Sequence, residues 1–326
     1  MLNLREQSSR GSESLSSFHI SLEEKMKKLL TLASLLVMAS LVLSACGGGG
    51  GSTATDLLGA IKERGYILIS TDPNYEPQSF LNTSGSRLAD TKCPSDALTT
   101  AEMQGFDVDV AIAVGDALGV ETCFATPGWD TLTAGNWADK WDMSVGSMTI
   151  TTARQQVLDF SVPYYYTPAV VAVLADSEFQ SLEDLSGQAI CAGVSTTYET
   201  WLNSGDLGLP ASSIYAQPPS GITVVPLESD QECAQALAAG RTDFAAYSTS
   251  VTVVNANIAA GIPVRQLGGA VYSEDLAAAF DKSSSLPTAS LIAEVNKLFE
   301  AMHSDGRLAD LSNKWLGEDL TQAPNN

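Results

Sequence analysis

The alternation of apolar and polar positions along the chain predicts short strands separated by amphipathic helices. The run YILIS at 66–70 is typical of a buried strand, and apolar residues at 105–118 recur at helical spacing. Further strands are predicted at 121–125 and 142–147, with a helix opening at 127–130 between them. This order of strands and helices favours an α/β domain built on a largely parallel sheet.

The same alternation begins again after an apolar, uncharged run at 169–175, which we interpret as a strand leaving the first domain. A second, smaller α/β domain follows, and the chain is expected to cross back near 270–280. The elements predicted for the later part are strands at 189–192, 222–227 and 242–248, a helix at 230–239, and closing helices at 289–302 and 308–315.

The N-terminal region carries the pattern of an export signal. Lysines 25, 27 and 28 precede an apolar run at 29–43, which is too short for a comfortable membrane span but suits a signal-peptide core. The run ends in LSAC at Cys46, which matches the bacterial lipobox, and a glycine-rich tether follows. We expect Cys46 to be lipidated, with an ordinary secretory signal or a helical anchor as alternatives. Residues 1–25 show no apolar periodicity, and Met26 resembles a natural start.

Length and charge bound the class of protein. The 326 residues suffice for two domains, and 17 Lys+Arg against 38 Asp+Glu give a net charge of −21. Nucleic-acid binding requires a basic face, so this balance argues against it. An acidic surface is most simply a soluble one.

The cysteines support export. Setting Cys46 aside leaves an even number, which in an exported protein suggests disulfides. We expect Cys93 to pair with Cys123 and Cys191 with Cys233, because each pair closes a local loop. Four buried free thiols are the alternative.

The stretch SVGSMTITTARQQVLDF at 144–160 carries the candidate chemistry. Small residues let a ligand approach the backbone, hydroxyl groups offer donors, and the guanidinium of Arg154 can take a carboxylate in bidentate fashion. This combination suits a small anion, although Arg154 could instead pair with Asp159 on its own helix. The only histidines are His19 and His303, so no His-based triad or metal site, no cofactor and no enzymatic activity are predicted.

Several longer stretches together resemble the solute-binding proteins of amino-acid ABC importers, the bacterial extracellular binding proteins of family 3. They include IKERGYILISTDPNYEP, GFDVDVAIAVGDALGV and DGRLADLSNKWLGED, and the resemblance covers about 56–319. It implies a two-lobed periplasmic-binding-protein type II fold, with each lobe a mostly parallel sheet flanked by helices and two hinge strands between them. The expected divisions are 1–45 (extension and signal peptide), 46–55 (tether), 56–168 (lobe 1), 169–270 (lobe 2), 271–319 (return to lobe 1) and 320–326 (disordered tail).

The resemblance also implies a ligand site between the lobes. Tyr75 and Trp129 would sandwich the ligand side chain, and Asp72 would make a polar contact. Arg154 would clamp the α-carboxylate of an amino acid. The remaining expected contacts are the strand-end residues Gly146, Ser147 and Thr149 and the turn Ser195, Thr196 and Thr197, which matches the family's Gly-Thr-Thr turn.

One position departs from the family pattern. The family usually places an acid after a GRTD-like stretch, where it pairs the α-ammonium of the ligand, and this chain has Ser248 there. A serine cannot neutralise a buried cation. Either Asp72 or another carboxylate compensates, or the ligand is not a standard α-amino acid.

The function implied is that of an extracytoplasmic lipoprotein on the outer face of the cytoplasmic membrane. It would bind a small carboxylate-bearing solute, most simply an amino acid, and deliver it as a monomer to an ABC permease. The alternatives are a cyclohexadienyl-dehydratase-like enzyme and a sensor for a signalling partner, both on the same scaffold.

Overall fold

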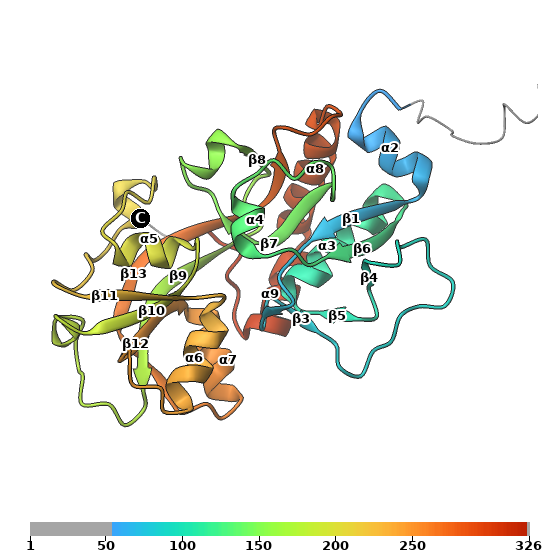
Figure 1. Cartoon of the computed structure of the whole chain (residues 1–326). Helices are drawn as coiled ribbons and strands as arrows, with labels where there is room; N and C mark the ends of the chain where they lie inside the picture. The colour runs from blue at the N-terminus through green and yellow to red at the C-terminus, as the bar shows by residue number, and fades with distance from the viewer. Residues whose placement is uncertain (1–53, 325–326) are drawn as a thin grey trace, which may run out of the picture. The chain divides into compact units, whose positions relative to one another are not determined.

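A computed structural model describes residues 54–324 (Figure 1). The predicted signal peptide, Cys46 and nearly all of the tether therefore lie outside the described residues. The helices are α2 (Leu57–Arg64), α3 (Phe106–Leu118), α4 (Trp129–Thr133), α5 (Thr197–Leu202), α6 (Asp230–Ala238), α7 (Val251–Ala259), α8 (Ala289–Asp305) and α9 (Arg307–Leu316). The strands are β1 (Tyr66–Ser70), β2 (Asn74–Tyr75), β3 (Ser79–Leu81), β4 (Leu98–Thr99), β5 (Met103–Gln104), β6 (Glu121–Ala125), β7 (Met143–Thr149), β8 (Leu158–Phe160), β9 (Tyr165–Leu174), β10 (Ala189–Gly193), β11 (Thr223–Leu227), β12 (Ala246–Ser250) and β13 (Val264–Asp281).

Local sequence signals account for the ends of the helices. Asp56 caps α2, because its side chain accepts a hydrogen bond from the N–H of Gly59 at 2.8 Å. Gly65 ends the same helix in the left-handed region, with φ of 79°, which a residue without Cβ adopts freely. The chain then enters β1 at once, as the pattern of apolar residues predicts.

The main sheet runs through both lobes in the order β11-β10-β12-β9-β13-β7-β1-β6-β4. Strand β1 pairs in parallel with β6 and β7, and β10 pairs in parallel with β11 and β12. The long strands β9 and β13 pair antiparallel with each other and connect the two halves, as Figure 1 shows at its centre. The expected α/β fold with two crossing strands is confirmed.

Each half of this sheet has its own apolar core. The first core contains Ile67, Phe106 and Phe299, which are fully buried, and it joins α3 and α8 to one part of the sheet. In the second half, separate clusters cover the sheet around Val171 and around Tyr247. We call these halves the first lobe and the second lobe. Helices cover the sheet in both lobes and bury the apolar side chains of its strands.

Both expected disulfides are present. Cys93 bonds to Cys123 in the first lobe, and Cys191 bonds to Cys233 in the second. Each bond links a strand to a neighbouring segment 30 or 42 residues away in the chain. The pairing by local loops is therefore confirmed.

Some predicted boundaries are wrong. The strand expected at 242–248 is β12, Ala246–Ser250, and the following helix α7 was not predicted. Arg154 lies on a short 3-10 helix, Arg154–Gln156. The tail expected from 320 onward begins in packed structure, because Leu320 accepts a hydrogen bond from Tyr166 at 2.8 Å and Thr321 is 3% exposed.

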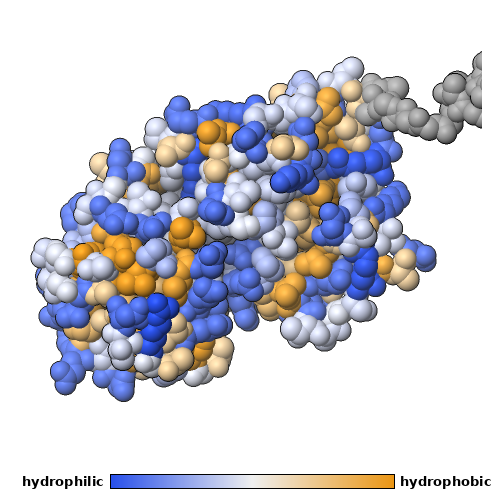
Figure 2. All heavy atoms as spheres, in the orientation of Figure 1, coloured by the Kyte–Doolittle hydropathy of each residue, from blue (hydrophilic) through white to orange (hydrophobic). Residues whose placement is uncertain are grey.

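The visible surface combines hydrophilic regions with apolar patches. Figure 2 shows hydrophilic residues over much of one face, with apolar residues in separate patches. Within 54–324, no helix combines the length and the apolar character needed to cross a membrane. The exposed large apolar side chains of the described residues are Leu81, Leu88, Val157, Tyr215 and Ile258.

Direct contacts hold the two lobes together across the cleft between them. The Tyr75 hydroxyl donates to Oγ of Ser250 at 3.3 Å, and the Gln78 amide donates to Oγ1 of Thr252 at 2.5 Å. Two-lobed binding folds close on ligands by hinge motion, and these contacts describe the closed arrangement.

Candidate functional site

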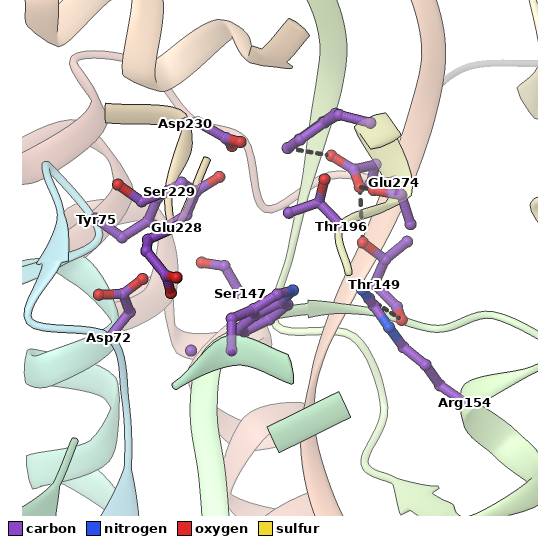
Figure 3. Close-up of a pocket in the computed structure, with 14 residues that line it drawn as sticks. Asp72, Tyr75, Ser147, Thr149, Arg154, Thr196, Glu228, Ser229, Asp230 and Glu274 are labelled. Atoms are coloured by element: carbon purple, nitrogen blue, oxygen red, sulfur yellow. Dashed lines mark hydrogen bonds between the residues drawn. The ribbon is translucent and has the colours of Figure 1, made fainter. Parts of the chain in front are cut away.

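A cavity lies between the lobes, at the carboxyl ends of the parallel strands (Figure 3). The structure brings most of the predicted site residues to its wall. Predicted residues that line it are Asp72, Tyr75, Trp129, Gly146, Ser147, Thr149, Arg154, Thr196 and Thr197. Lining residues that sequence reasoning missed are Tyr198, Glu228, Ser229, Asp230 and Glu274.

Ser195 lies at a neighbouring cavity rather than at this one. That second cavity shares Arg154, Thr196 and Thr197 with the first. The Ser195 N–H is already used, because it donates to Oε2 of Glu199 at 2.7 Å. Its carbonyl accepts a hydrogen bond from Arg154 at 3.3 Å, so Ser195 orients the arginine.

Arg154 is held at the cleft by backbone carbonyls and an aromatic ring. Its Nη1 donates to the carbonyl of Thr149 at 3.1 Å, and its guanidinium carbon lies 5.4 Å from the centroid of the Trp129 ring. The residue is 7% exposed. Burial lowers the pKa of Arg154 to about 10, which leaves it charged at neutral pH.

No ion pair among residues 54–324 joins this buried cation to a carboxylate, although the nearby charge of Glu274 opposes the lowering of its pKa. Among residues 54–324, no acidic oxygen lies within 4.0 Å of the Arg154 guanidinium. The alternative of an ion pair with Asp159 is wrong: Asp159 lies on β8 and pairs with Lys282 at 3.5 Å. A buried guanidinium without a counterion is costly, so the site is suited to receive an anion.

Ser147 lines the cavity, but its hydrogen-bond donors are used within the protein. Its N–H donates to the Tyr164 hydroxyl at 2.9 Å, and its Oγ donates to Asp107 at 2.7 Å. The Tyr164 hydroxyl donates to the same carboxyl group at 2.7 Å. Burial raises the pKa of Asp107 to about 7. Asp107 therefore holds Ser147 and Tyr164 in place beneath the cavity.

Glu274 is a site residue that the strand pattern did not reveal. It lies on β13, is 1% exposed, and accepts hydrogen bonds from hydroxyl groups of both lobes. Thr149 and Thr197 donate to its Oε1, each at 2.7 Å, and Tyr198 donates to its Oε2 at 2.8 Å. Burial raises the pKa of Glu274, and these three hydrogen bonds oppose the rise. An acid within a buried apolar strand is the signal that could have identified it.

Asp230 is a second buried acid at the cavity. It begins α6, directly after the end of β11, and is 3% exposed. Oδ1 accepts from the N–H of Gly193 at 2.8 Å, and Oδ2 accepts from the Thr249 hydroxyl at 3.1 Å. Burial raises the pKa of Asp230 to about 7, these bonds oppose the rise, and the charges of Glu274 and Asp72 add to it.

Ser248 does not line the cavity. It lies inside β12, is fully buried, and donates from Oγ to the carbonyl of Val170 at 3.2 Å. Because β12 runs on to Ser250, the residue at the strand end is Ser250, which caps α7 and contacts Tyr75. The structure therefore does not bring Ser248 to the cavity, since the strand ends two residues later than predicted.

The charges of the cavity are separated. Figure 3 shows Asp72, Glu228 and Asp230 on one side. Arg154 and Glu274 lie on the other side, next to Thr149. Burial raises the pKa of Asp72, and the hydrogen bond from Asn74 opposes the rise. The site thus has an anion-binding side at Arg154 and an acidic side formed by Asp72, Glu228 and Asp230.

Comparison with known proteins agrees with this arrangement. The sequence model of the bacterial extracellular solute-binding proteins, family 3, matches residues 67–318. The chain belongs to this family. It is 26% identical to L-cystine-binding protein TcyJ from Escherichia coli, covering 82% of this chain and 88% of the relative. It is 25% identical to L-cystine-binding protein TcyA from Bacillus subtilis, and the alignment covers 91% of this chain and 100% of the relative.

Solved structures of the family have the same fold. A mutant of ArgBP from T. maritima aligns with a TM-score of 0.64 at 25% identity, covering 80% of this chain and 99% of that one. The ancestral amino acid-binding protein AncCDT-1, a precursor of cyclohexadienyl dehydratase, aligns with a TM-score of 0.63 at 25% identity. It covers 79% of this chain and 99% of that one.

Proposed function

We propose that this protein binds a free amino acid in the interlobe cavity and delivers it to the permease of an ABC importer. The observation that carries the proposal is the buried guanidinium of Arg154, which lines the cavity and has no carboxylate within 4.0 Å among the described residues. An amino-acid carboxylate supplies the missing counterion.

The aromatic residues at the cavity support a ligand with a side chain. Tyr75 and Trp129 come from the first lobe and line the cavity with Arg154. Nε1 of Trp129 is buried and has no hydrogen-bond partner in the part of the chain that the structure describes. An unpartnered buried donor is unfavourable unless a ligand or water accepts from it.

A thermal-shift screen over the common amino acids and small carboxylates tests the proposal. A ligand that binds only the folded state stabilises it by about 2.7 kcal/mol at a hundredfold excess over Kd. We expect at least one amino acid to raise the unfolding midpoint. A screen in which no amino acid shifts the midpoint, while another class of solute does, would contradict the proposal.

We further propose that the protein is exported and anchored through a lipid on Cys46. The lipobox-like LSAC sequence and the glycine tether support this. Cys46→Ser should release the protein from the membrane fraction while leaving ligand binding unchanged. Membrane association that persists in this variant would argue for a different anchor.

A second candidate is a dehydratase acting on a cyclic carboxylate, favoured by one observation. Glu274 is a buried carboxyl group in the cleft, of the kind that such an enzyme needs as a proton donor. Incubation with prephenate, followed by measurement of the aromatic product, distinguishes the candidates. Turnover would favour the enzyme, and lack of turnover together with tight amino-acid binding would favour the transport protein.

A further inference from the structure

Glu274 lies where the two lobes meet, on one of the strands that connect them. Its backbone is in register with Thr167 of β9, so the residue sits within the paired hinge strands. Its carboxyl group accepts hydrogen bonds from the hydroxyl groups of Thr149 in the first lobe and of Thr197 and Tyr198 in the second. The carboxyl group thus contacts elements of both lobes at the cavity.

Three hydroxyl groups and the nearby charge of Arg154 favour the ionised form of Glu274, although Arg154 forms no direct ion pair with it. Three hydroxyl donors point at its oxygens, and each of these donors is itself at least nine-tenths buried, at 3–5% exposure. No lysine or arginine of residues 54–324 lies within 4.0 Å. Among the described residues, Oε2 accepts one hydrogen bond, from Tyr198, and has a lone pair left for another donor.

Glu274 is also adjacent to the anion-binding end of the cavity. Thr149 connects the two charges, because its carbonyl accepts from Arg154 and its hydroxyl donates to Glu274. In an α-amino acid the carboxylate and the ammonium share one carbon atom, so their partners must be neighbours. In Figure 3, Asp230 and Asp72 lie on the other side of the cavity from Arg154.

We propose that Glu274 binds the α-ammonium group of the ligand, the group for which the family resemblance implied an acid at the position of Ser248. Glu274 then selects α-amino acids over carboxylic acids that lack the amine. This inference rests on the proposed function, because it requires that the ligand carboxylate binds at Arg154.

The test compares each amino acid with its analogue in which hydrogen replaces the α-ammonium. The probes are L-arginine with 5-guanidinopentanoate, L-glutamine with 4-carbamoylbutanoate, and L-cystine with 3,3′-dithiodipropanoate, titrated calorimetrically into the full exported chain. The pair containing the tightest amino acid is then titrated into Glu274→Gln. This substitution keeps the shape of the side chain and an oxygen for the Thr149 and Thr197 hydroxyls.

We expect Glu274→Gln to weaken binding of the amino acid by about 30-fold or more, because a buried charge pair loses one partner. Binding of the des-amino analogue should change by less than about threefold, since it makes no such pair. The matched control is Asp230→Asn, which should leave the ratio of the two affinities within about threefold of the unmodified protein's ratio.

Three results would overturn the inference while leaving the proposed function intact. The first is equal loss of both ligands in Glu274→Gln, which would mark a purely structural role for the hydroxyl network. The second is a collapse of the affinity ratio in Asp230→Asn instead. The third needs no variant: an unmodified protein that binds both members of the pair equally well. Failure of every amino acid to bind would instead contradict the proposed function.

Discussion

The hydroxyl of Thr152 in the first lobe donates a hydrogen bond to the carbonyl of Gly208 in the second lobe, at 3.1 Å. Gly208 has φ of 63°, and a Cβ placed on it would lie 2.7 Å from the Thr152 backbone nitrogen. Only a residue without a side chain fits this approach. The contact belongs to the closed arrangement, so the affinity for ligand depends on it.

Gly208→Ala should weaken ligand binding by roughly tenfold, because it penalises the closed state from which the ligand gains its contacts. Calorimetry measures the affinity. Gly240→Ala is the matched control: Gly240 also has positive φ, at 85°, but its Cβ would meet nothing within 4 Å. Equal effects of the two substitutions would show that backbone strain, not the contact between lobes, is responsible.

Arg154→Ala should weaken binding of an amino acid by about tenfold or more, because it removes the charge-assisted partner of the carboxylate. Arg154→Lys should recover only part of the affinity, since an ammonium group cannot make the planar bidentate contact. Arg307→Ala serves as the control, because Arg307 is exposed and pairs with Asp305 at 2.8 Å away from the cavity. An affinity unchanged in Arg154→Ala would remove this residue from the site.

The free energy of unfolding should fall as the pH rises from the ordinary pKa of Asp107, 3.8, to its raised pKa of about 7 in the folded protein. Burial raises the pKa of Asp107 to about 7 in the folded protein, whereas its ordinary value is 3.8. The folded state therefore binds more protons than the unfolded state between these values, and the unfolding free energy decreases with rising pH. The slope for one such group reaches about 1.4 kcal/mol per pH unit.

Denaturant unfolding at several pH values between 4 and 8 checks this expectation. Asp107→Asn should reduce the decline, and Asp230→Asn should reduce it further because burial also raises the pKa of Asp230 to about 7. Asp116→Asn, an exposed position on the same helix as Asp107, should leave the slope unchanged. A slope that is the same in Asp107→Asn and the unmodified protein would contradict the assignment.

Removal of the second-lobe disulfide should lower stability without abolishing the site. The Cys191–Cys233 bond closes a loop with a sequence separation of 42, for which the chain-entropy model gives about 4 kcal/mol. Replacing both cysteines by alanine and following thermal unfolding measures the loss. The first-lobe pair, Cys93 and Cys123, is the natural comparison, and its shorter separation of 30 predicts a slightly smaller loss.

Residues whose role depends on local pattern could be predicted. Thr149 is the last residue of β7 and Arg154 follows it closely, so both lie at the cavity. Tyr75 and Trp129 follow the neighbouring strands β1 and β6 to the same edge. Parallel strands bring their carboxyl ends together, so position in the alternation is enough to place such side chains near one another. The disulfide pairs could be predicted as well, because each bond closes a local loop.

Residues whose role depends on partners distant in the sequence could not be predicted. Ser147 has a hydroxyl group at the expected strand end, yet this hydroxyl donates its hydrogen bond to Asp107, 40 positions away. Glu274 lies 125 positions from Thr149 and 77 from Thr197, and both donate to the same oxygen. Hydrogen-bond partners at such separations are set by how the lobes pack, which no window of sequence reports.

The sequence by itself determined the order of strands and helices, the disulfide pairs, the arginine at the cleft and the family resemblance. These depend on periodicity, spacing and motifs that are contained in short segments. The tertiary structure decided which polar groups face the cavity and which are already paired. It moved Ser248 into the sheet interior and placed Glu274 beside Arg154, because two lobes must meet before their side chains share one buried site.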